Sequence, residues 1–195
     1  MGHEHAAMLV LASASPRRRE LLRWLVAEYE LETAQVDESP LPAEPAPSLV
    51  ARLARAKADA VRARRPGAWI LAADTIVELD GDILGKPADA RDAVAMLGRL
   101  SGREHRVFTG FTLLAPGGEH RSGTVESRVL FRPLDALRIE GYVATGEPLD
   151  KAGAYAIQGR GAGLVARVDG SFTNVIGLPL AEVGAVLGEA GLLAR

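Results

Sequence analysis

The sequence predicts an α/β fold in which helices flank a mixed, twisted β-sheet. Three observations predict it: apolar runs of strand length alternate with stretches of helical periodicity, turn-forming residues separate them, and no segment repeats. A length of 195 residues with 48% hydrophobic and 25% charged side chains is ample for one sizeable core. We therefore expect a single domain over residues 8–195, preceded by a flexible extension over residues 1–7.

Local signals near the N-terminus justify the first elements. An apolar strand is expected over residues 8–12, and it ends at a Ser-rich turn. Ser15 followed by Pro16 is typical of a helix N-cap and a first helical residue, which predicts a helix over 17–28. The segment 37–47 is rich in proline and acidic residues, so we expect a loop there.

Periodicity and turn chemistry predict the elements that follow. Ser48 is expected to cap a helix that ends near Arg65, because apolar residues recur on one of its faces. Trp69–Leu79 is a long apolar strand, and Asp80-Gly81 is a hairpin turn into a return strand. The remaining elements are expected to be a helix capped by Asp89 and ending near Leu100, strands over 104–115 and 124–132, a helix near 135–144, a strand over 164–168 and a closing helix over 179–190.

Composition excludes several classes of function. The chain has no cysteine, so it has no disulfide, thiolate nucleophile or cysteine-ligated zinc. No apolar run is long enough to span a bilayer, and residues 1–7 lack the features of a secretory signal, so we expect a cytoplasmic protein without a membrane partner. A net charge of -2 argues against a nucleic-acid partner. The four histidines have no metal-ligand spacing, and we assign them no role.

The segment from Ser13 to Arg19 is the first candidate site. It joins a strand to a helix N-terminus, where free backbone N–H groups and the positive end of the helix dipole favour an anion. Four side chains add donors at the same place: Ser13, Ser15, Arg17 and Arg18. Cations in the first turn of a helix oppose its dipole, and a bound phosphate chain would offset that cost. The alternative is a solvated arginine patch beside an ordinary cap.

Lysine is rare in this chain, since only three of its 23 basic residues are lysines. An ammonium is a compact point charge that suits a tight phosphate site. Lys57 lies near the middle of the apolar face of the second predicted helix, where a cation must be paired or reach an anion. A lysine that snorkels from the edge of the core is the alternative. The hairpin should bring Lys86, in Gly85-Lys86-Pro87, back alongside the strand over 69–79.

Asp74 is a carboxylate in the middle of an apolar strand, with Thr75 beside it. Such a carboxylate is desolvated unless it has partners, which makes it a candidate base or metal ligand. The alternative is a carboxylate satisfied by the backbone at a strand end or bulge. Glu38, in the acidic pair Asp37-Glu38, could supply a second carboxylate to a hard cation, although that pair alone indicates only a solvated loop.

The Gly-rich segment 146–159 mixes charged and amide groups with turn formers. Glu147, Asp150, Lys151 and Gln158 crowd a segment that otherwise consists of small residues. This composition favours a binding loop over a purely structural loop, which stays open as the alternative.

Together these segments resemble the Maf family, the septum-formation-inhibitor-like nucleotide pyrophosphatases, over nearly the whole chain. Phe172 and Thr173 depart mildly from the family pattern, in which Tyr and Ser are common there, and residues 1–7 lie outside the resemblance. The motifs that carry it are Leu11-Ala-Ser-Ala-Ser-Pro-Arg-Arg18, Ala73-Asp-Thr75, Gly85-Lys-Pro87, Leu100-Ser-Gly102, Gly146-Glu-Pro-Leu-Asp-Lys-Ala-Gly-Ala-Tyr155, Ile157-Gln-Gly159 and Gly177-Leu-Pro-Leu180.

The resemblance implies an α/β fold related to the inosine-triphosphate pyrophosphatases, with the active site in a cleft between two lobes. It also implies a divalent cation (Mg2+, Mn2+ or Co2+) and a homodimer. By the same resemblance Asp74 is the catalytic base, and Arg17, Thr75 and Gln158 are the positions that select the nucleobase. The pairing of Arg17 with Gln158 is similar to the branch that acts on dTTP and UTP, because the sister branch for N7-methyl-GTP carries Trp and Glu at these positions.

The residues and the resemblance together predict a pyrophosphatase that cleaves dTTP and UTP, and modified pyrimidine nucleotides as further substrates, to the monophosphate and pyrophosphate. We expect Glu38 and Asp74 to hold the cation and Asp74 to orient or deprotonate the attacking water. Two alternatives stay open: N7-methyl-GTP or another modified nucleotide as substrate, and a nucleotide-binding regulator of septum formation or cell division. Four cations are expected to neutralise the triphosphate: Arg17, Arg18, Lys57 and Lys86.

Overall fold

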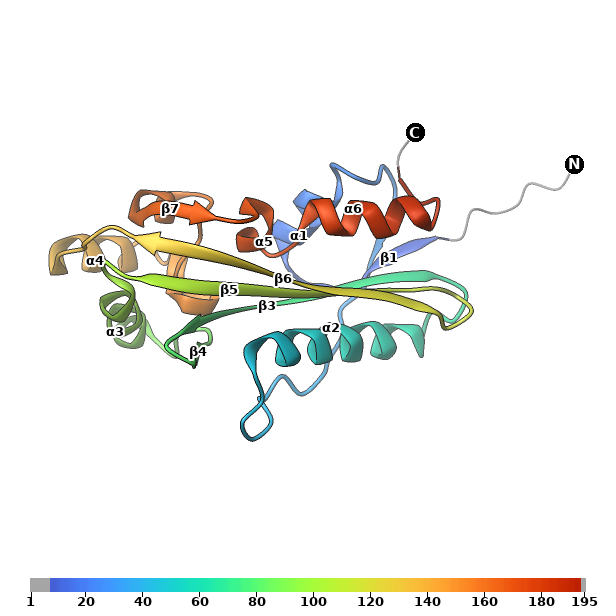
Figure 1. Ribbon diagram of the computed structural model, residues 1–195, viewed down its shortest axis with the longest axis horizontal. Helices are drawn as coiled ribbons and strands as arrows, with labels where there is room; N and C mark the ends of the chain where they lie inside the picture. The colour runs from blue at the N-terminus through green and yellow to red at the C-terminus, as the bar shows by residue number, and fades with distance from the viewer. Residues whose placement is uncertain (1–7, 194–195) are drawn as a thin grey trace, which may run out of the picture. The chain divides into compact units, whose positions relative to one another are not determined.

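The computed structural model describes residues 8–193, so the expected extension over residues 1–7 lies outside the described residues. Within this range the strands form a sheet of order β2-β1-β3-β5-β6-β7, with β4 paired to β3 (Figure 1). β1 is parallel to β2 and β3, whereas β4 and β7 are antiparallel to β3 and β6. The sheet is therefore mixed, as predicted. Its strands are β1 (Leu9–Leu11), β2 (Glu30–Leu31), β3 (Trp69–Leu79), β4 (Asp82–Leu84), β5 (Glu104–Leu114), β6 (His120–Phe131) and β7 (Val165–Asp169).

Helices flank this sheet, which confirms the predicted α/β fold class. The helices are α1 (Pro16–Leu22), α2 (Ala46–Arg62), α3 (Ala90–Leu100), α4 (Ala136–Val143), α5 (Phe172–Ile176) and α6 (Leu180–Glu189). The Gly-rich segment after α4 contains short 3-10 turns, namely η1 (Glu147–Asp150), η2 (Ala152–Ala154) and η3 (Arg160–Leu164). No helix between residues 8 and 193 has the length and apolar character needed to cross a membrane.

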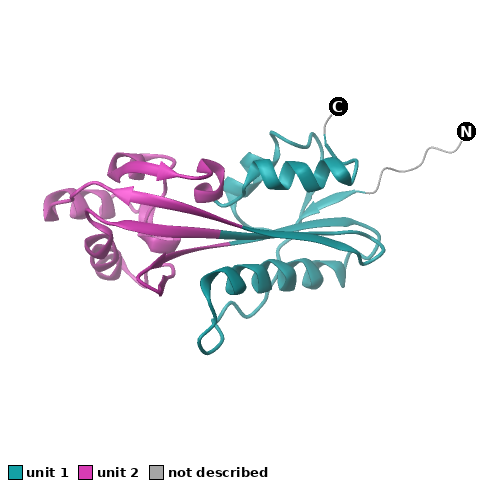
Figure 2. Ribbon diagram, viewed as in Figure 1, with its two compact units in different colours: residues 1–74, 109–124, 177–195 teal, residues 75–108, 125–176 magenta. Residues whose placement is uncertain are grey.

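The chain divides into two compact units (Figure 2). Unit 1 comprises the described residues of Met1–Asp74, Thr109–Thr124 and Gly177–Arg195, and unit 2 comprises Thr75–Phe108 and Val125–Ile176. Each unit therefore contains parts of β3, β5 and β6. The single domain over residues 8–195 stays a prediction.

The core of unit 1 forms where α2 packs on β1 and β3. Ala58 and Val61 of α2 belong to one buried cluster with Ile70 and Ala72 of β3. Gly110 lets β5 also approach α2 closely, because a Cβ atom there would overlap with the backbone of α2. Figure 2 shows α2 on one side of the unit 1 strands and α6 on the other.

Local chemistry sets the ends of the elements in unit 2. The hairpin between β3 and β4 turns at Asp80 and Gly81, whose positive φ angles of 55° and 91° suit a two-residue hairpin. Asp89 caps α3 by accepting a hydrogen bond from the Asp92 N–H at 2.8 Å, as predicted. Asp135 caps α4 in the same way.

Some predicted boundaries are wrong. Ser48 does not cap α2, because the helix begins at Ala46 after Pro45 and has no side-chain cap. The helix predicted over 17–28 ends at Leu22, after which the chain turns toward β2, a strand that the sequence did not indicate. Strand β6 begins four residues earlier than predicted, at His120 rather than residue 124, and the short helix α5 was not predicted.

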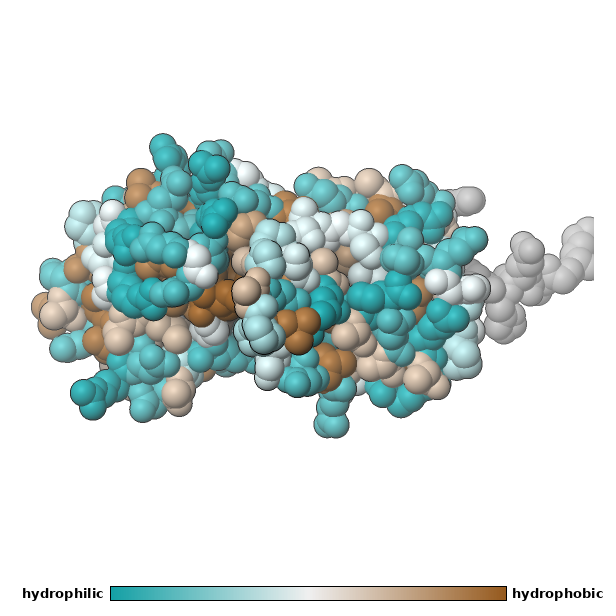
Figure 3. Space-filling view, turned by 60° about the horizontal axis from the view of Figure 1, so that its bottom comes forward, coloured by the Kyte–Doolittle hydropathy of each residue, from teal (hydrophilic) through white to brown (hydrophobic). Residues whose placement is uncertain are grey.

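One face of the described residues carries mainly hydrophilic side chains. Figure 3 shows hydrophilic side chains over most of the face in view, with apolar residues in small separate patches. Single exposed apolar residues of this kind are normal for soluble proteins. The large exposed apolar side chains are those of Met8, Trp24, Leu31, Leu41, Leu137, Leu149, Phe172 and Leu193.

Candidate active site

The segment before α1 is held by side-chain hydrogen bonds. Ser15 is the N-cap of α1, as predicted, and its Oγ accepts a hydrogen bond from the Arg18 N–H at 3.4 Å. Ser13 Oγ accepts from the Ser15 N–H at 3.2 Å and from Arg18 Nη1 at 3.4 Å. Arg18 Nε donates to the Gly177 carbonyl at 2.8 Å. These contacts fix the Arg18 guanidinium, and Arg17 lies beside it, half-buried.

The seven residues of α1 are fewer than the sequence predicted. A short helix has a small macrodipole, so the helix end contributes less to anion binding than expected. The donors available to an anion at this place are therefore mainly side chains.

Lys57 is a buried cation that is paired with two carboxylates. Its Nζ donates to Asp74 Oδ1 and lies 2.6 Å from Glu38 Oε1. The Lys57 and Asp74 side chains are each 10% exposed, whereas the Glu38 side chain is 57% exposed. The expectation that Lys57 must be paired or reach an anion is confirmed, and the alternative of a snorkelling lysine is wrong.

Packing of α2 on β3 explains why this pair meets. Val61 of α2 and Ile70 and Ala72 of β3 share one core cluster. Lys57 lies one helical turn before Val61, and Asp74 lies two residues after Ala72 on the same face of the strand. The contact that buries the apolar residues therefore also buries the ammonium against the carboxylate. Asp74 Oδ1 thus accepts from a side chain, whereas the alternative was a carboxylate satisfied by the backbone.

Arg18 belongs electrostatically to the same cluster. Removal from water lowers the pKa of its guanidinium, the negative charges of Asp74 and Glu38 raise it, and Arg17 lowers it further. Two carboxylates and two held cations thus influence one another within unit 1. We call Arg18, Glu38, Lys57 and Asp74 the charged cluster.

The charged cluster has a donor set that fits a hard divalent cation. Glu38 and Asp74 both direct carboxylate oxygens at one ammonium, so they can converge on one positive charge. No group of three or more His, Cys, Asp or Glu residues suited to a metal ion occurs among residues 8–193. Mg2+ commonly uses one or two protein carboxylates together with substrate phosphates and water, so two carboxylates are sufficient.

A pocket of about 480 Å3 opens beside the N-terminal end of α1 in unit 1. Ser13, Ser15 and Arg19 of the predicted Ser13–Arg19 site line it, together with two polar residues that the sequence did not indicate, Glu32 and Thr33. Glu32 also forms an ion pair with Arg64 at 2.5 Å. The position of Arg19 in the Ser13–Arg19 segment was a signal for this pocket, whereas Glu32 and Thr33 follow a strand that was not predicted.

Three predicted site residues lie in unit 2. Thr75 directly follows Asp74 in β3 and is half-buried, Lys86 is exposed after β4, and Gln158 is half-buried between η2 and η3. Antiparallel pairing of β4 with β3 confirms that the hairpin brings the chain back along β3. The Gly85 carbonyl accepts a hydrogen bond from the Gly153 N–H at 3.0 Å, which ties the Lys86 segment to the Gly-rich loop.

The charged residues of the Gly-rich loop mainly hold the loop itself. Glu147 accepts hydrogen bonds from the Tyr142 hydroxyl at 2.9 Å, the Gly161 N–H at 3.0 Å and the Arg160 N–H at 3.1 Å. Burial alone would raise the pKa of the Glu147 carboxyl, but these hydrogen bonds lower it overall. Lys151 Nζ donates to the Glu147 carbonyl at 2.7 Å. The loop is thus a structured support for Gln158.

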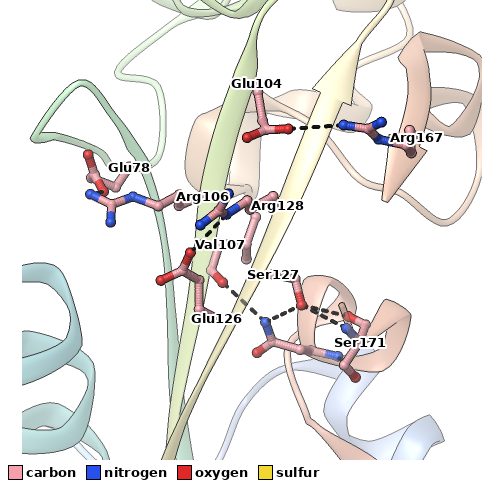
Figure 4. Close-up of polar contacts among 10 residues, drawn as sticks. Glu78, Glu104, Arg106, Val107, Glu126, Ser127, Arg128, Arg167 and Ser171 are labelled. Carbon is pink, nitrogen blue, oxygen red and sulfur yellow. Dashed lines mark hydrogen bonds and ion pairs between the residues drawn. The ribbon is translucent and has the colours of Figure 1, made fainter. Parts of the chain in front are cut away.

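Unit 2 also contains a buried polar network that the sequence did not indicate (Figure 4). Asn174 Nδ2 of α5 donates to Ser127 Oγ at 2.9 Å and to the Val107 carbonyl at 3.1 Å. Ser127 Oγ in turn donates to the Ser171 carbonyl at 3.1 Å and accepts from the Ser171 N–H at 3.0 Å. The network anchors α5 to β5 and β6. Phe172 and Thr173, the two departures from the family pattern, lie on this anchored helix.

Comparison with known proteins gives near full-length matches. The family model described as Maf-like protein matches residues 8–190. A relative from Myxococcus xanthus (strain DK1622) is 55% identical over 185 residues, covering 95% of this chain and 93% of the relative. One from Symbiobacterium thermophilum is 51% identical, covering 94% of each chain, and one from Cupriavidus metallidurans is 53% identical, covering 95% and 98%. All three relatives are named dTTP/UTP pyrophosphatase.

A solved structure, the nucleoside-triphosphatase / dITP/XTP pyrophosphatase from Mycobacterium abscessus, matches 94% of this chain and 97% of its own. The sequence identity is 15% and the TM-score is 0.46, so this likeness supports no statement about the reaction. The family model and the three relatives match the chain across the motifs named above, and they show its family without the solved structure. The chain belongs to the Maf family.

Proposed function

We propose that this chain hydrolyses dTTP and UTP to the nucleoside monophosphate and pyrophosphate, and so removes unwanted nucleotides from the cellular pool. Relatives of this name share 51% to 55% of their residues with it over nearly their whole length. The structural observation that carries the proposal is the charged cluster, in which the buried Asp74 carboxylate lies against Lys57 near the fixed Arg18.

The cations of the chain bind the triphosphate in this proposal. Arg18 is held in place by Gly177 and Ser13, so its charge is available without a change of conformation. Lys57 supplies a second charge from α2. Arg17 and Lys86 are the two further phosphate ligands that the sequence predicts. Together they compensate the charge of the leaving pyrophosphate.

Asp74 orients or deprotonates the water that attacks the α-phosphorus. The Asp74 carboxylate is buried in the middle of β3 and is oriented by the hydrogen bond from Lys57 to Oδ1, so it can position a water for this attack. A divalent cation (Mg2+, Mn2+ or Co2+) held by Glu38 and Asp74 would supply charge stabilisation at the phosphate oxygens. The reaction needs no covalent enzyme intermediate.

Arg17, Thr75 and Gln158 select the base in the proposed reaction. A glutamine amide has both a donor and an acceptor, so Gln158 can pair with the alternating carbonyl and imide N–H edge of uracil or thymine. The Gly-rich loop that carries Gln158 is braced by Glu147 and Lys151, which restricts the positions that the amide can take.

We further propose that the protein acts in the cytoplasm as a homodimer. The family resemblance supports the dimer, and the lack of cysteine in the sequence is compatible with a reducing compartment. Size-exclusion chromatography with light scattering would measure the oligomeric state directly.

A substrate panel tests the proposed reaction. The purified chain is incubated with dTTP, UTP, N7-methyl-GTP and the common triphosphates, each with Mg2+, Mn2+ or Co2+, and released pyrophosphate and monophosphate are measured. We expect pyrophosphate release with the highest kcat/KM for dTTP and UTP. Release of inorganic phosphate and a diphosphate would overturn the proposed bond cleavage. Tight nucleotide binding without turnover in any of the metals would instead support a nucleotide-binding regulator.

A further inference from the structure

The Lys57 ammonium occupies the position on which the two acidic side chains of the charged cluster converge. Glu38 reaches it from the loop before α2, and Asp74 reaches it from the middle of β3. Both carboxylates contact the same Nζ atom, with Glu38 Oε1 at 2.6 Å. The two acids come from distant parts of the sequence, so this convergence is a product of the fold.

A divalent cation and this ammonium compete for the same oxygens. Carboxylate oxygens are the ligands that hard cations prefer, and here the ones suited to a metal already accept from Lys57. Two positive centres cannot share these oxygens at contact distance without strong repulsion, because a site with little water screens charge poorly. Metal binding at these oxygens therefore requires that Lys57 move away from at least one carboxylate.

Lys57 can move, whereas Arg18 is fixed. Arg18 donates to the Gly177 carbonyl at 2.8 Å and to Ser13 Oγ at 3.4 Å, contacts that do not involve either carboxylate. Lys57 Nζ instead contacts the two carboxylates, and its four-carbon stem has several rotatable bonds. The lysine is thus the cation of the cluster that can exchange partners.

Charge balance decides when the exchange is favourable. The two carboxylates, Lys57 and Arg18 are together neutral, so a divalent cation alone would leave the cluster with excess positive charge in a mostly buried place. A triphosphate that arrives with the metal brings excess negative charge, and its oxygens offer Lys57 a new partner. Metal, nucleotide and lysine can then all be paired.

From this arrangement we propose that Lys57 is a built-in cation that occupies the metal position in the free protein and is transferred to the phosphates when the metal–nucleotide complex binds. The free protein then binds divalent metal weakly, and metal and triphosphate bind together. This inference rests on the proposed function for the identity of the nucleotide. It assigns Lys57 a positioning role toward the metal in addition to its role as a phosphate ligand.

Calorimetric titration of the nucleotide-free protein with Mn2+ tests the proposal. We expect Lys57→Met to bind Mn2+ at least roughly tenfold more tightly than the unaltered protein, since the competing charge is gone. Lys57→Arg keeps a cation and should bind Mn2+ about as weakly as the unaltered protein. Arg55→Met is the matched control, because it removes one positive charge from the same helix at a residue paired with Asp59. It should change the Mn2+ affinity by less than about twofold.

Equal or weaker Mn2+ binding by Lys57→Met, with its fold verified by circular dichroism, would overturn the proposal. The same holds if Arg55→Met tightens Mn2+ binding as much as Lys57→Met does, because a general charge effect would then explain both. If Lys57→Met does not fold, Lys57→Gln is titrated in its place with the same expected and contradicting outcomes. No substrate is turned over in these titrations, so their failure would leave the proposed pyrophosphatase reaction intact, and a failed substrate panel would not change the metal result.

Discussion

The energetics of single residues in the charged cluster explain why its members depend on one another. Burying an ammonium or a carboxylate alone costs several kcal/mol, and the cost is reduced only when the two charges lie together with good geometry. Lys57 and Asp74 meet this condition, since each is about nine-tenths buried and each is the other's partner. Glu38 is largely exposed, so its ion pair with Lys57 contributes little to stability. Its proposed role is as a ligand in the active site.

Asp74→Asn tests the role of the carboxylate as the base. Asparagine has the same shape and can still accept a hydrogen bond from Lys57, but it cannot take a proton from water. We expect turnover of dTTP to fall at least roughly a hundredfold, while a non-hydrolysable dTTP analogue still binds. Stopped-flow pyrophosphate detection and calorimetry measure the two quantities. Turnover near that of the unaltered protein would remove Asp74 from the base role.

Base choice is tested at Arg17 and Gln158. An ionised glutamate offers only acceptors, which suits a cationic methylated guanine and repels the carbonyl-rich edge of uracil or thymine. The double variant Arg17→Trp with Gln158→Glu should therefore lower kcat/KM for dTTP and UTP and raise it for N7-methyl-GTP. If the unaltered protein already prefers N7-methyl-GTP in the substrate panel, these two residues do not select pyrimidines, although the chemistry of hydrolysis would stand.

At the scale of elements, the sequence predicts best where one short segment contains the whole cause. Ser15 and Asp89 cap their helices with their own side chains, and Asp80-Gly81 forms its turn through its own positive φ angles. The prediction that Ser48 caps α2 was wrong, because the helix starts earlier, at Ala46 after Pro45, and has no side-chain cap. Strand β2 was missed because it has only two residues and depends on pairing with β1.

Prediction of the candidate site from the sequence is limited in the same way, to features that one short segment contains. Asp74, Lys57 and Glu38 could each be singled out, since each is an unusual residue for its local pattern. Their meeting could not be predicted, because it depends on how α2 packs on β3 and on where the loop before α2 runs. The hydrogen-bond network of Asn174 was not predicted for a similar reason, because its partners lie 47 and 67 residues away in the chain.

Gly110 tests how closely α2 must approach the sheet. A Cβ at this position would overlap with the Val50 carbonyl oxygen and lie 2.7 Å from the Ala51 nitrogen, both of which are backbone atoms that cannot rotate away. Gly110→Ala should lower the free energy of unfolding by about 1–3 kcal/mol or more, measured by urea denaturation. Gly117→Ala is the control, because a Cβ there meets nothing within 4 Å. Equal stability of the two variants would show that α2 can shift without cost.

For the whole molecule, acid stability depends on a group that the sequence analysis left without a role. His105 is 2% exposed, its Nε2 lies 2.8 Å from the Tyr155 hydroxyl, and its ring packs edge-on against Phe131 and Tyr155. Nδ1 is buried and has no hydrogen-bond partner among the described residues. Burial lowers the pKa of His105 from 6.5 to about 4, because this apolar environment disfavours the charged ring. The folded protein therefore holds His105 neutral at pH values where the unfolded chain protonates it.

The direction of the pH effect follows from this difference. Well above pH 6.5 neither state is protonated at His105, and the full stability is present. As the pH falls through 6.5 toward about 4, the unfolded chain binds a proton that the folded protein does not, so stability falls. At about 1.36 kcal/mol per pKa unit, the loss from pH 7.5 to pH 5 is about 2 kcal/mol. His105→Phe removes the titrating group and keeps a ring at the position, so its free energy of unfolding should fall by about 2 kcal/mol less over the same interval. Urea denaturation of both proteins at pH 7.5, 6 and 5 measures the difference, in which the contributions of all other acidic groups cancel. Parallel losses in the two proteins would show that His105 is protonated as readily in the folded state as in the unfolded chain.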